Sequence, residues 1–436
     1  MNTGILTAAL FGAMMLCLIA GLPLAFSFGG IAVIFIVLLM GPSGLFIIIS
    51  SAFDGWTNYI LIAIPLFVLM ANFLERSGIA RELYDAMYKW IGRLRGGLAI
   101  GTIVICAVFA ALSGISALAT VTMGLIALPS MLSKGYDKRI SIGAISAGGT
   151  LGILIPPSIV MIFYGAFTET SVGALFMAGI IPGIMLALIF MIYIAVRTHL
   201  QPSLAPALPE KYTLKEKIIN LKSLILPMIL ILLVLGVIYT GIATPTEASG
   251  IGAFGAFLIL VLTRRFTWKV LQESVARTLS ITVMGLWIVL GAKSFTHIYV
   301  TIGAVDLVSG IINNLAVNPW LIIILMQLIL IALGMFIDTL GVMLITIPIF
   351  VPLIISMRFD PVWFGILYTI NMEMGYITPP FGFNLFYMKS IVEPMGFGME
   401  DVYRSIAPFF FLEVLGLVIV MIFPQLCLWL PSTMMK

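Results

Sequence analysis

Residues Gly148 to Tyr164 read GGTLGILIPPSIVMIFY, an apolar stretch with two consecutive prolines at its centre. The stretch recurs in altered form from Asn371 to Tyr387 as NMEMGYITPPFGFNLFY, at a constant offset of 223 residues. A helix that breaks at membrane depth leaves backbone amides and carbonyls without partners, which costs several kcal/mol per group. An ion, a substrate or another broken helix usually fills such a gap. We therefore expect the two stretches to form the two halves of one binding site.

The composition excludes a soluble globular protein. Of the 436 residues, 62% are hydrophobic and 9% are charged, whereas about a quarter of the residues of a soluble domain are charged. Apolar runs of about 17 to 25 residues, long enough to cross a hydrocarbon layer of about 30 Å, recur along the chain. The sequence thus predicts an all-α polytopic membrane protein embedded in a lipid bilayer. Its scattered basic residues indicate no nucleic-acid partner, and its three cysteines lack metal-ligand spacing, so we expect no cofactor beyond a coupling ion.

Further motifs repeat at nearly the same offset. Pro23 and Pro245 are 222 residues apart, and Pro129 and Pro352 are 223 apart. We therefore predict two copies of one fold, residues 1–205 and 215–436, with residues 206–214 belonging to a proline-containing cytoplasmic linker. Each copy is expected to contain three spans, a re-entrant helical hairpin, a broken helix and a final span. The hairpins are predicted at 98–132 and 320–356, the broken helices at 141–166 and 362–388, and the spans at 5–20, 24–40, 57–74, 172–196, 224–240, 247–263, 279–296 and 406–430.

The basic residues predict the orientation of the chain. An odd number of spans per copy gives the two copies inverted topologies. With the N-terminus outside, the inner loops hold 19 of the 22 basic residues and leave only Lys293, Arg358 and Lys436 elsewhere. Since Lys and Arg concentrate in cytoplasmic loops, we expect the N- and C-termini on the periplasmic side of a multi-pass protein of the cytoplasmic (inner) membrane.

Three local patterns carry structural expectations. Residues Arg81 to Gly96 alternate apolar and charged positions at helical spacing, which indicates an amphipathic helix in the membrane interface; a plain cytoplasmic loop helix is the alternative. Trp268 to Thr278 is a second candidate for such a helix. Glu247 follows Thr244 at the spacing of a capping box and is expected to have a structural role.

Each copy has two irregular points at membrane depth. The first has a hairpin turn at Leu112 to Thr120 and a break at Gly148 to Ser158, and the second has Phe336 to Gly341 and Glu373 to Asn384. Unwound carbonyls and hydroxyls suit a hard cation, whereas the N-terminal ends of half-helices favour an anion. The combination predicts cation-coupled anion transport. Cation ligands suggested by residue type are Ser113, Ser116 and Thr150 in the first copy, with Asp338 and Glu373 in the second.

Each of these features also has a plainer reading. A single Pro or Gly break is as often an ordinary kink. Asp338 is alternatively a cap on its hairpin turn, and Glu373 a shallower residue or a link to another helix.

At these residues the chain resembles the DctM-like large membrane subunit of the tripartite ATP-independent periplasmic (TRAP) transporters. The resemblance covers essentially the whole chain. It rests on ATPTEASGIGAFGAF (243–257), on the two proline-proline breaks, on SGISALAT and on DTLG.

This resemblance implies an elevator fold like that of the ion transporter superfamily, sodium as the coupling ion, a separate small membrane subunit and a periplasmic substrate-binding protein. The imported substrate would be a carboxylate-bearing organic anion such as a C4-dicarboxylate or sialic acid. One sodium ion would lie between the first turn and break, a second between the second turn and break, and the substrate between the ions. The implied sodium positions are Ser113, Ser116, Gly148, Thr150, Gly152, Pro156, Asp338, Thr339, Gly341, Glu373, Gly375, Thr378 and Pro379. The implied substrate positions are Ser116, Ser158, Thr339 and Asn384.

Rival functions are a stand-alone sodium/dicarboxylate or citrate symporter, an intramembrane hydrolase and a channel. The chain has only two histidines, His199 and His297, and neither forms a recognisable catalytic pair. Closed hairpins without charged rings argue against a channel. The sequence therefore favours a transporter over an enzyme, and leaves the identity of the anion open.

Overall fold

The computed structural model describes residues 3–210, 212–304, 307, 310 and 318–435, and the regular secondary structure in these ranges is helical. By length and composition, seven described helices suit a membrane crossing, and an eighth segment, Leu214–Asn220 with Leu224–Tyr239, is bent by 47°. The predicted all-helical, multi-span architecture is therefore confirmed. The seven helices are Tyr59–Arg76, Ser116–Ser133, Val172–Leu200, Pro245–Leu262, Trp268–Thr301, Thr339–Ser356 and Met399–Ile422.

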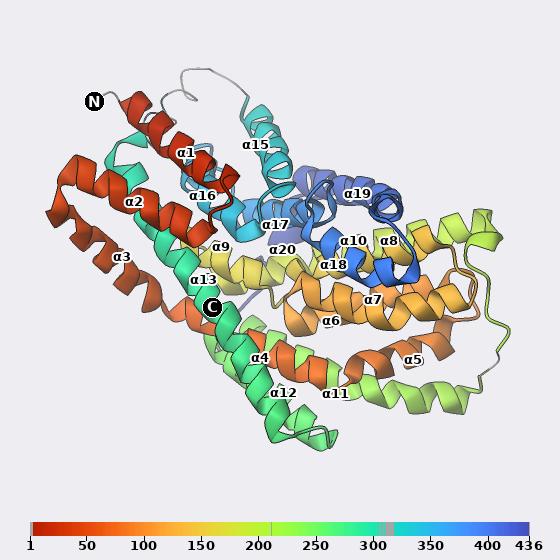
Figure 1. Ribbon diagram of the computed structural model, residues 1–436. Coiled ribbons are helices and arrows are strands. Elements are labelled where there is room, and N and C mark those ends of the chain that lie inside the picture. Colours follow the sequence, from red (N-terminus) through yellow and green to blue (C-terminus); the bar gives the residue numbers. More distant parts are fainter. Residues whose placement is uncertain (1–2, 211, 305–306, 308–309, 311–317, 436) are drawn as a thin grey trace.

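The described parts of the chain are a succession of helices (Figure 1). The first part of the chain contains α1 (Thr3–Ile19), α2 (Leu24–Met40), α3 (Phe46–Trp56), α4 (Ala63–Arg76), α5 (Ile79–Ile91), α6 (Gly97–Ser113), α7 (Ser116–Ser133), α8 (Lys138–Thr150), α9 (Ile159–Thr168) and α10 (Val172–Leu200). The second part contains α11 (Leu214–Tyr239), α12 (Pro245–Leu262), α13 (Trp268–Thr301), α15 (Pro319–Gly334), α16 (Thr339–Ser356), α17 (Pro361–Ile377), α18 (Phe383–Val392), α19 (Met399–Ile422) and α20 (Gln425–Ser432).

Four parts of the chain differ from the sequence prediction. Helix α3 was not predicted, and the predicted span 406–430 is divided into α19 and α20. Helix α11 starts ten residues before the predicted span because Thr213 and Glu216 form a capping box at its beginning. The expectation of a separate interfacial helix at Trp268 to Thr278 is wrong, because this segment is the first third of the continuous α13.

Two groups of helices pack around each other. We call α1–α5 with α11–α13 the outer frame, and α6–α10 with α15–α20 the inner bundle. In the frame, α13 packs on α2, α3 and α4, and α12 packs on α4 and α11. In the bundle, α8 packs on α6, α7 and α19, while α17 packs on α15 and α19. Figure 1 shows α13 running diagonally past α2 and α3.

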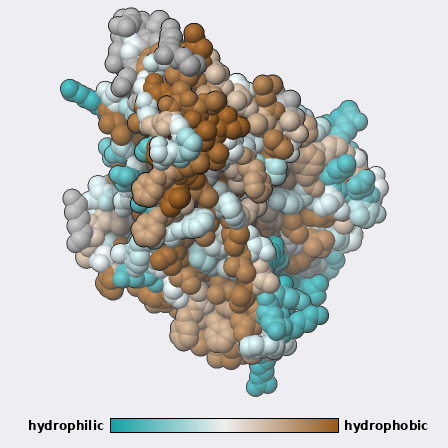
Figure 2. Space-filling view, turned by 60° about the vertical axis from the view of Figure 1, so that its left-hand side comes forward, coloured by the Kyte–Doolittle hydropathy of each residue, from teal (hydrophilic) through white to brown (hydrophobic). Residues whose placement is uncertain are grey.

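The surface is apolar over wide areas, as expected for a protein in contact with lipid. Large exposed apolar side chains include Leu232 of α11, Phe254 of α12 and Trp287 of α13. Brown, hydrophobic surface covers much of the face in Figure 2, and hydrophilic side chains project at its margins. Such an area has no counterpart on a soluble monomer.

Ion pairs join the polar segments that the charge pattern assigns to one side of the membrane. Arg277 pairs with Glu75 and Arg265 with Glu82, and Lys138 of α8 pairs with Asp401 of α19. These pairs bring together loops far apart in the sequence. Which side faces the periplasm stays a prediction.

The amphipathic segment at Arg81 to Gly96 is helical as far as Ile91, where α5 ends, and it anchors the linker. The Tyr88 hydroxyl donates to Glu210 at 2.5 Å, and Lys134 approaches the same carboxylate at 2.9 Å. These two contacts lower the pKa of Glu210 below its usual value. The Trp90 indole donates to the carbonyl of Lys217. The predicted capping box of Thr244 and Glu247 is confirmed at the start of α12.

Candidate functional site

One cavity of about 350 Å³ is enclosed by the starts of four helices. Helix α7 begins at Ser116, α9 at Ile159, α16 at Thr339 and α18 at Phe383, and all four residues line the cavity. A helix N-terminus presents unpaired backbone amides and a partial positive charge. Four such ends around one space make it suited to an anion.

The first turn and the first break are in direct contact. Gly114, which ends α6, has a φ of +63°, a conformation that other residues rarely adopt. A Cβ atom at Gly114 would collide with the carbonyl oxygen of Pro157, and one at Gly152 would lie 3.0 Å from the backbone of Ile115. Glycine therefore allows the α6–α7 turn to sit against the break between α8 and α9.

The second turn and break use a related arrangement. Asp338 caps α16 by accepting a hydrogen bond from the Leu340 amide at 3.2 Å. A Cβ atom at Gly375 of α17 would lie 3.1 Å from the Cα of Gly334, the last residue of α15. The peptide bonds Pro156–Pro157 and Pro379–Pro380 are both cis.

A hydrogen bond connects the turn of one copy to the break of the other. The Ser116 hydroxyl, at the start of α7, donates to Oδ1 of Asn384 in α18 at 3.0 Å. The side-chain amide of Asn384 donates in turn to the carbonyl of Ser146 in α8 at 3.3 Å. These contacts link the two breaks across the cavity.

The outer frame closes the other side of the cavity with one cation. Arg277 of α13 lines the cavity and holds Glu75 at 2.9 Å, and its side chain is 49% exposed. Asn72 of α4 also lines the cavity, where it donates to Thr278 at 3.0 Å. The lining thus contains one basic side chain, Arg277, and one acidic side chain, Asp338, beside the four helix starts.

Three of the four substrate residues implied by the resemblance line the cavity, and the fourth does not. Ser116, Thr339 and Asn384 line the cavity. The Thr339 hydroxyl is buried and has no hydrogen-bond partner among the described residues. Ser158 is fully buried outside the lining, where its hydroxyl donates to Ile153 and caps the Met161 amide.

Some of the sodium residues implied for the first half of the chain lie at the turn, and others lie away from it. Ser113 and Ser116 lie at the turn, and the Ser113 hydroxyl donates to the Phe109 carbonyl at 2.8 Å. Gly152 packs on this turn, whereas Gly148 packs on Cys106 and Ile103 of α6. Thr150 is turned away, with its hydroxyl 2.8 Å from Glu413 of α19. Pro156 belongs to the cis peptide bond of the break.

Of the sodium residues implied for the second half of the chain, those at the turn line the cavity and Glu373 does not. Asp338 and Thr339 line the cavity, and the Thr378 hydroxyl donates to the Met374 carbonyl at 2.5 Å. Gly341 packs on Leu24 of α2, and Pro379 opens the second cis bond. Glu373 is fully buried outside the lining.

Two residues of this region were not identified from the sequence. Arg277 was counted only as a basic loop residue, because its place beside the cavity depends on the packing of α13. Glu413 lies in FFFLEVLGLV, an apolar run with a single acid. Its position in that run was a sufficient signal, since an acid inside a membrane helix is costly and usually functional.

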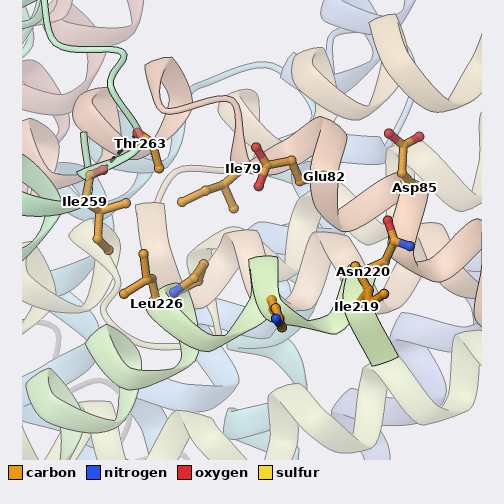
Figure 3. Close-up of a pocket in the computed structure, with 10 residues that line it drawn as sticks. Ile79, Glu82, Asp85, Ile219, Asn220, Leu226, Ile259 and Thr263 are labelled. Atoms are coloured by element: carbon orange, nitrogen blue, oxygen red, sulfur yellow. Dashed lines mark hydrogen bonds between the residues drawn. The ribbon is translucent and has the colours of Figure 1, made fainter. Parts of the chain in front are cut away.

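Two further cavities contain none of the predicted site residues. One of about 400 Å³ lies between α5, α11 and α12, with Glu82 and Asp85 on one wall and Ile219 and Leu226 on the other (Figure 3). Another of about 680 Å³ lies between α3, α13 and α16. The cavity at the four helix starts is therefore the candidate site.

Comparisons with known proteins identify relatives of the whole chain. The family model of the tripartite ATP-independent periplasmic transporter, DctM component, matches residues 11–426. The chain is 34% identical to the C4-dicarboxylate TRAP transporter large permease protein DctM of Pseudomonas aeruginosa, over 91% of this chain and 92% of the relative. It is 30% identical to the sialic acid TRAP transporter large permease protein SiaM of Vibrio cholerae, over 95% and 96%.

A solved structure supports the fold. The YdaH transporter of Alcanivorax borkumensis superposes with a TM-score of 0.66 over 94% of this chain and 97% of that one, at 14% identity. At this identity the match concerns the fold alone. The resemblance identified from the proline-proline breaks is confirmed by the family match.

Proposed function

The chain belongs to the DctM component family of the tripartite ATP-independent periplasmic transporters, and on that premise we propose that it imports a carboxylate-bearing organic anion, driven by sodium. Its relatives are transporter permeases and not enzymes. The observation that carries the proposal is the cavity at the starts of α7, α9, α16 and α18. An anion there would accept backbone amide hydrogen bonds and face Arg277 of the outer frame.

Sodium would bind beside this anion at the two hairpin turns. Supporting features are the hydroxyls of Ser113 and Ser116 at the first turn, and Asp338 with the unpaired hydroxyl of Thr339 at the second. Hard cations prefer such oxygen ligands. A bound cation would reduce the repulsion between the carboxylate of Asp338 and that of the substrate, which couples the two binding events.

We propose that the two halves are inverted repeats and that the inner bundle moves against the outer frame as an elevator. In support, α2 packs on α13 and α12 packs on α4, so that the second helix of each half contacts the third span of the other. Such reciprocal contacts are expected for two copies related by a twofold axis in the membrane plane. The cavity also lies between the two groups, with α4 and α13 of the frame facing the four helix starts of the bundle.

The complete transporter would contain further chains. We propose that a small membrane subunit covers part of the apolar frame surface, and that a periplasmic binding protein delivers the anion to the outer face of the cytoplasmic membrane. Relatives with this architecture carry names that include C4-dicarboxylate and sialic acid. Both compounds bear carboxylates, and this chain is expected to take a substrate of that class.

A stand-alone sodium/dicarboxylate or citrate symporter is the alternative, since the same cavity would serve it without a binding protein. Uptake by this chain alone would favour the alternative. No uptake until the small subunit and the binding protein are added would favour the tripartite system.

Labelling of the cavity tests its role directly. In a variant in which Cys17, Cys106 and Cys427 are replaced by serine, a single cysteine at Leu340 lines the cavity. We expect succinate or sialic acid to slow its reaction with a maleimide in sodium, and not in potassium. A single cysteine at Val300, which lines the cavity of about 680 Å³ between α3, α13 and α16, is the matched control. Protection that is equal at both positions, or absent for every carboxylate tested, would contradict the site.

A further inference from the structure

Two buried acids of the inner bundle have no partner of opposite charge. Glu373 and Glu413 are both 0% exposed. Both carboxylate oxygens of Glu373 and Oε2 of Glu413 have no hydrogen-bond partner among the described residues. Neither acid takes part in any ion pair found in the described part of the chain. An uncompensated carboxylate in such a place is strongly unfavourable. The two acids therefore require a positively charged partner or a proton.

The direction of Glu373 follows from its neighbours on α17. Asn371 donates to the Gln327 carbonyl of α15 at 2.9 Å, and Gly375 packs on Gly334 of the same helix. Residues four apart lie on one face of a helix, and the residue midway between them lies roughly opposite. Glu373 therefore points away from α15, toward the side on which α17 packs against α19, the helix that carries Glu413.

Thr150 adds an oxygen to this side of the bundle. Its hydroxyl lies 2.8 Å from Oε1 of Glu413 and 2.7 Å from the carbonyl of Ala147. Helices α8, α17 and α19 pack on one another pairwise, so the three side chains come from three helices that meet. Thr150 and Glu373 are also 223 residues apart, the offset of the two breaks. They occupy equivalent positions in the two copies.

The helix ends favour a cation at this position. Helix α8 ends at Thr150, and Glu373 lies four residues before Ile377, the last residue of α17. A helix C-terminus carries a partial negative charge and unpaired carbonyl groups, and half-helix ends of this kind coordinate sodium in transporters. This polarity is opposite to that of the cavity, where four helix N-termini meet.

Nearby basic groups do not supply the missing charge. Helix α17 contains no Lys or Arg, and Arg404 of α19 is nine residues from Glu413, about 13 Å along the axis. On α8, Arg139 is eleven residues from Thr150, about 16 Å away. The described residues also contain no group of three or more His, Cys, Asp and Glu side chains that could hold a metal. The set of carboxyl, hydroxyl and carbonyl oxygens suits a hard cation such as sodium, and it lacks the imidazole and thiolate groups that zinc and copper prefer.

We propose that Glu373, Glu413 and Thr150 form a sodium site at the crossing of the two broken helices, separate from the sites at the hairpin turns. The single charge of the ion balances one carboxylate, and the other carboxyl group keeps its proton. The site deepens the proposed function and rests on it. The ion would join α8, α17 and α19, one helix of the first copy and two of the second. It would tie the two breaks together while the inner bundle moves.

Equilibrium binding of radioactive sodium to the purified chain tests the site without any transport. Glu413→Gln keeps the size of the side chain and its contact with Thr150 but removes the charge. We expect this variant to bind one sodium ion fewer per chain than the unmodified protein. Glu400→Gln, on the exposed start of the same helix, is the matched control and should bind the full number. Thr150→Val should weaken binding of that ion, and Thr150→Ser should restore it.

A double variant separates this site from the hairpin sites. The double variant Ser116→Ala, Glu413→Gln should bind fewer sodium ions per chain than either single variant. The proposal would be overturned if Glu413→Gln and Thr150→Val both bind the same number of sodium ions per chain as the unmodified protein. It would also be overturned if calcium, but not lithium, displaces the ion. If Glu413→Gln does not remain monodisperse on size-exclusion chromatography, the Thr150→Val and Thr150→Ser pair decides. Absent uptake with normal sodium binding would contradict the proposed function and leave this site intact.

Discussion

Asp338 is the residue at which an observed structural role coincides with the proposed role in sodium binding. Its carboxylate caps α16, which is the cap anticipated as an alternative from the sequence, and it also lines the cavity at the hairpin turn. Substitution by asparagine separates the roles, because asparagine caps a helix about as well as aspartate but carries no charge.

Asp338→Asn should therefore fold normally and lose its response to sodium. We expect the sodium concentration for half-maximal uptake to rise at least about tenfold, equivalent to about 1.4 kcal/mol. Asp338→Ala should show the same change and also lose about 1 kcal/mol of stability with the cap. Ser116→Ala should weaken the sodium response as well. Normal sodium activation of uptake in both Asp338→Asn and Ser116→Ala would contradict the sodium site and show that Asp338 only caps α16.

Arg277 is the cation that the outer frame presents to the cavity. Charged hydrogen bonds contribute about 1.5–3 kcal/mol, so Arg277→Gln should raise KM for the anion by at least about tenfold with a smaller effect on kcat. Lys269→Gln, near the start of the same helix and 84% exposed, is the control. Because Arg277 also pairs with Glu75, Glu75→Gln should be measured in parallel. An equal rise in KM in Glu75→Gln would assign the effect to the ion pair.

At the scale of elements, glycines allow the hairpins and broken helices to approach closely. Gly375 lies against the Gly334 backbone, and Gly152 lies against the turn at Ile115. Backbone atoms cannot move aside as the end of a flexible side chain can. The positions at which α15 meets α17, and the α6–α7 turn meets the first break, therefore depend on the absence of a side chain.

Gly375→Ala tests this packing. The added methyl group should destabilise the purified protein by about 1–3 kcal/mol, the usual effect of overpacking, and lower its Tm. Gly250→Ala in α12 is the matched control, since a Cβ atom there meets nothing within 4 Å. A thermal unfolding assay in detergent measures both variants. Equal Tm values for the two variants would show that the bundle tolerates a side chain at Gly375.

Helix positions in this chain could be predicted well from sequence, because apolar runs, Pro-Pro breaks and glycine turns act locally. Helices α6 and α7 together cover 97–133, and α8 and α9 cover 138–168, which agrees to within three residues with the ranges expected for the first hairpin and broken span. Side-chain directions could not be predicted in the same way. Thr150 and Glu373 were expected, as parts of the two breaks, to bind cations together with the turns. The Thr150 hydroxyl instead contacts Glu413, and neither residue lines the cavity, because rotation about each helix axis is determined by packing between distant segments. The early start of α11 was missed although its capping box is visible in the sequence.

At the scale of the molecule, the cavity lies between two groups of helices that contribute different chemistry. The inner bundle supplies four helix starts and the hydroxyls and carboxylate of the turns, and the outer frame supplies Arg277 and Asn72. A substrate bound between them contacts both groups. Movement of one group against the other would therefore change the surroundings of the anion, as alternating access requires.

Reconstitution into liposomes tests the central claim, that this cavity serves sodium-driven import within a tripartite system. Uptake of a labelled carboxylate is measured with an inward sodium gradient for this chain alone, then with the small subunit, and then with the periplasmic binding protein added outside. We predict uptake only in the complete system, abolished when potassium replaces sodium and strongly reduced by Arg277→Gln. Sodium-driven uptake by this chain alone, or uptake by the complete system without sodium, would contradict the account.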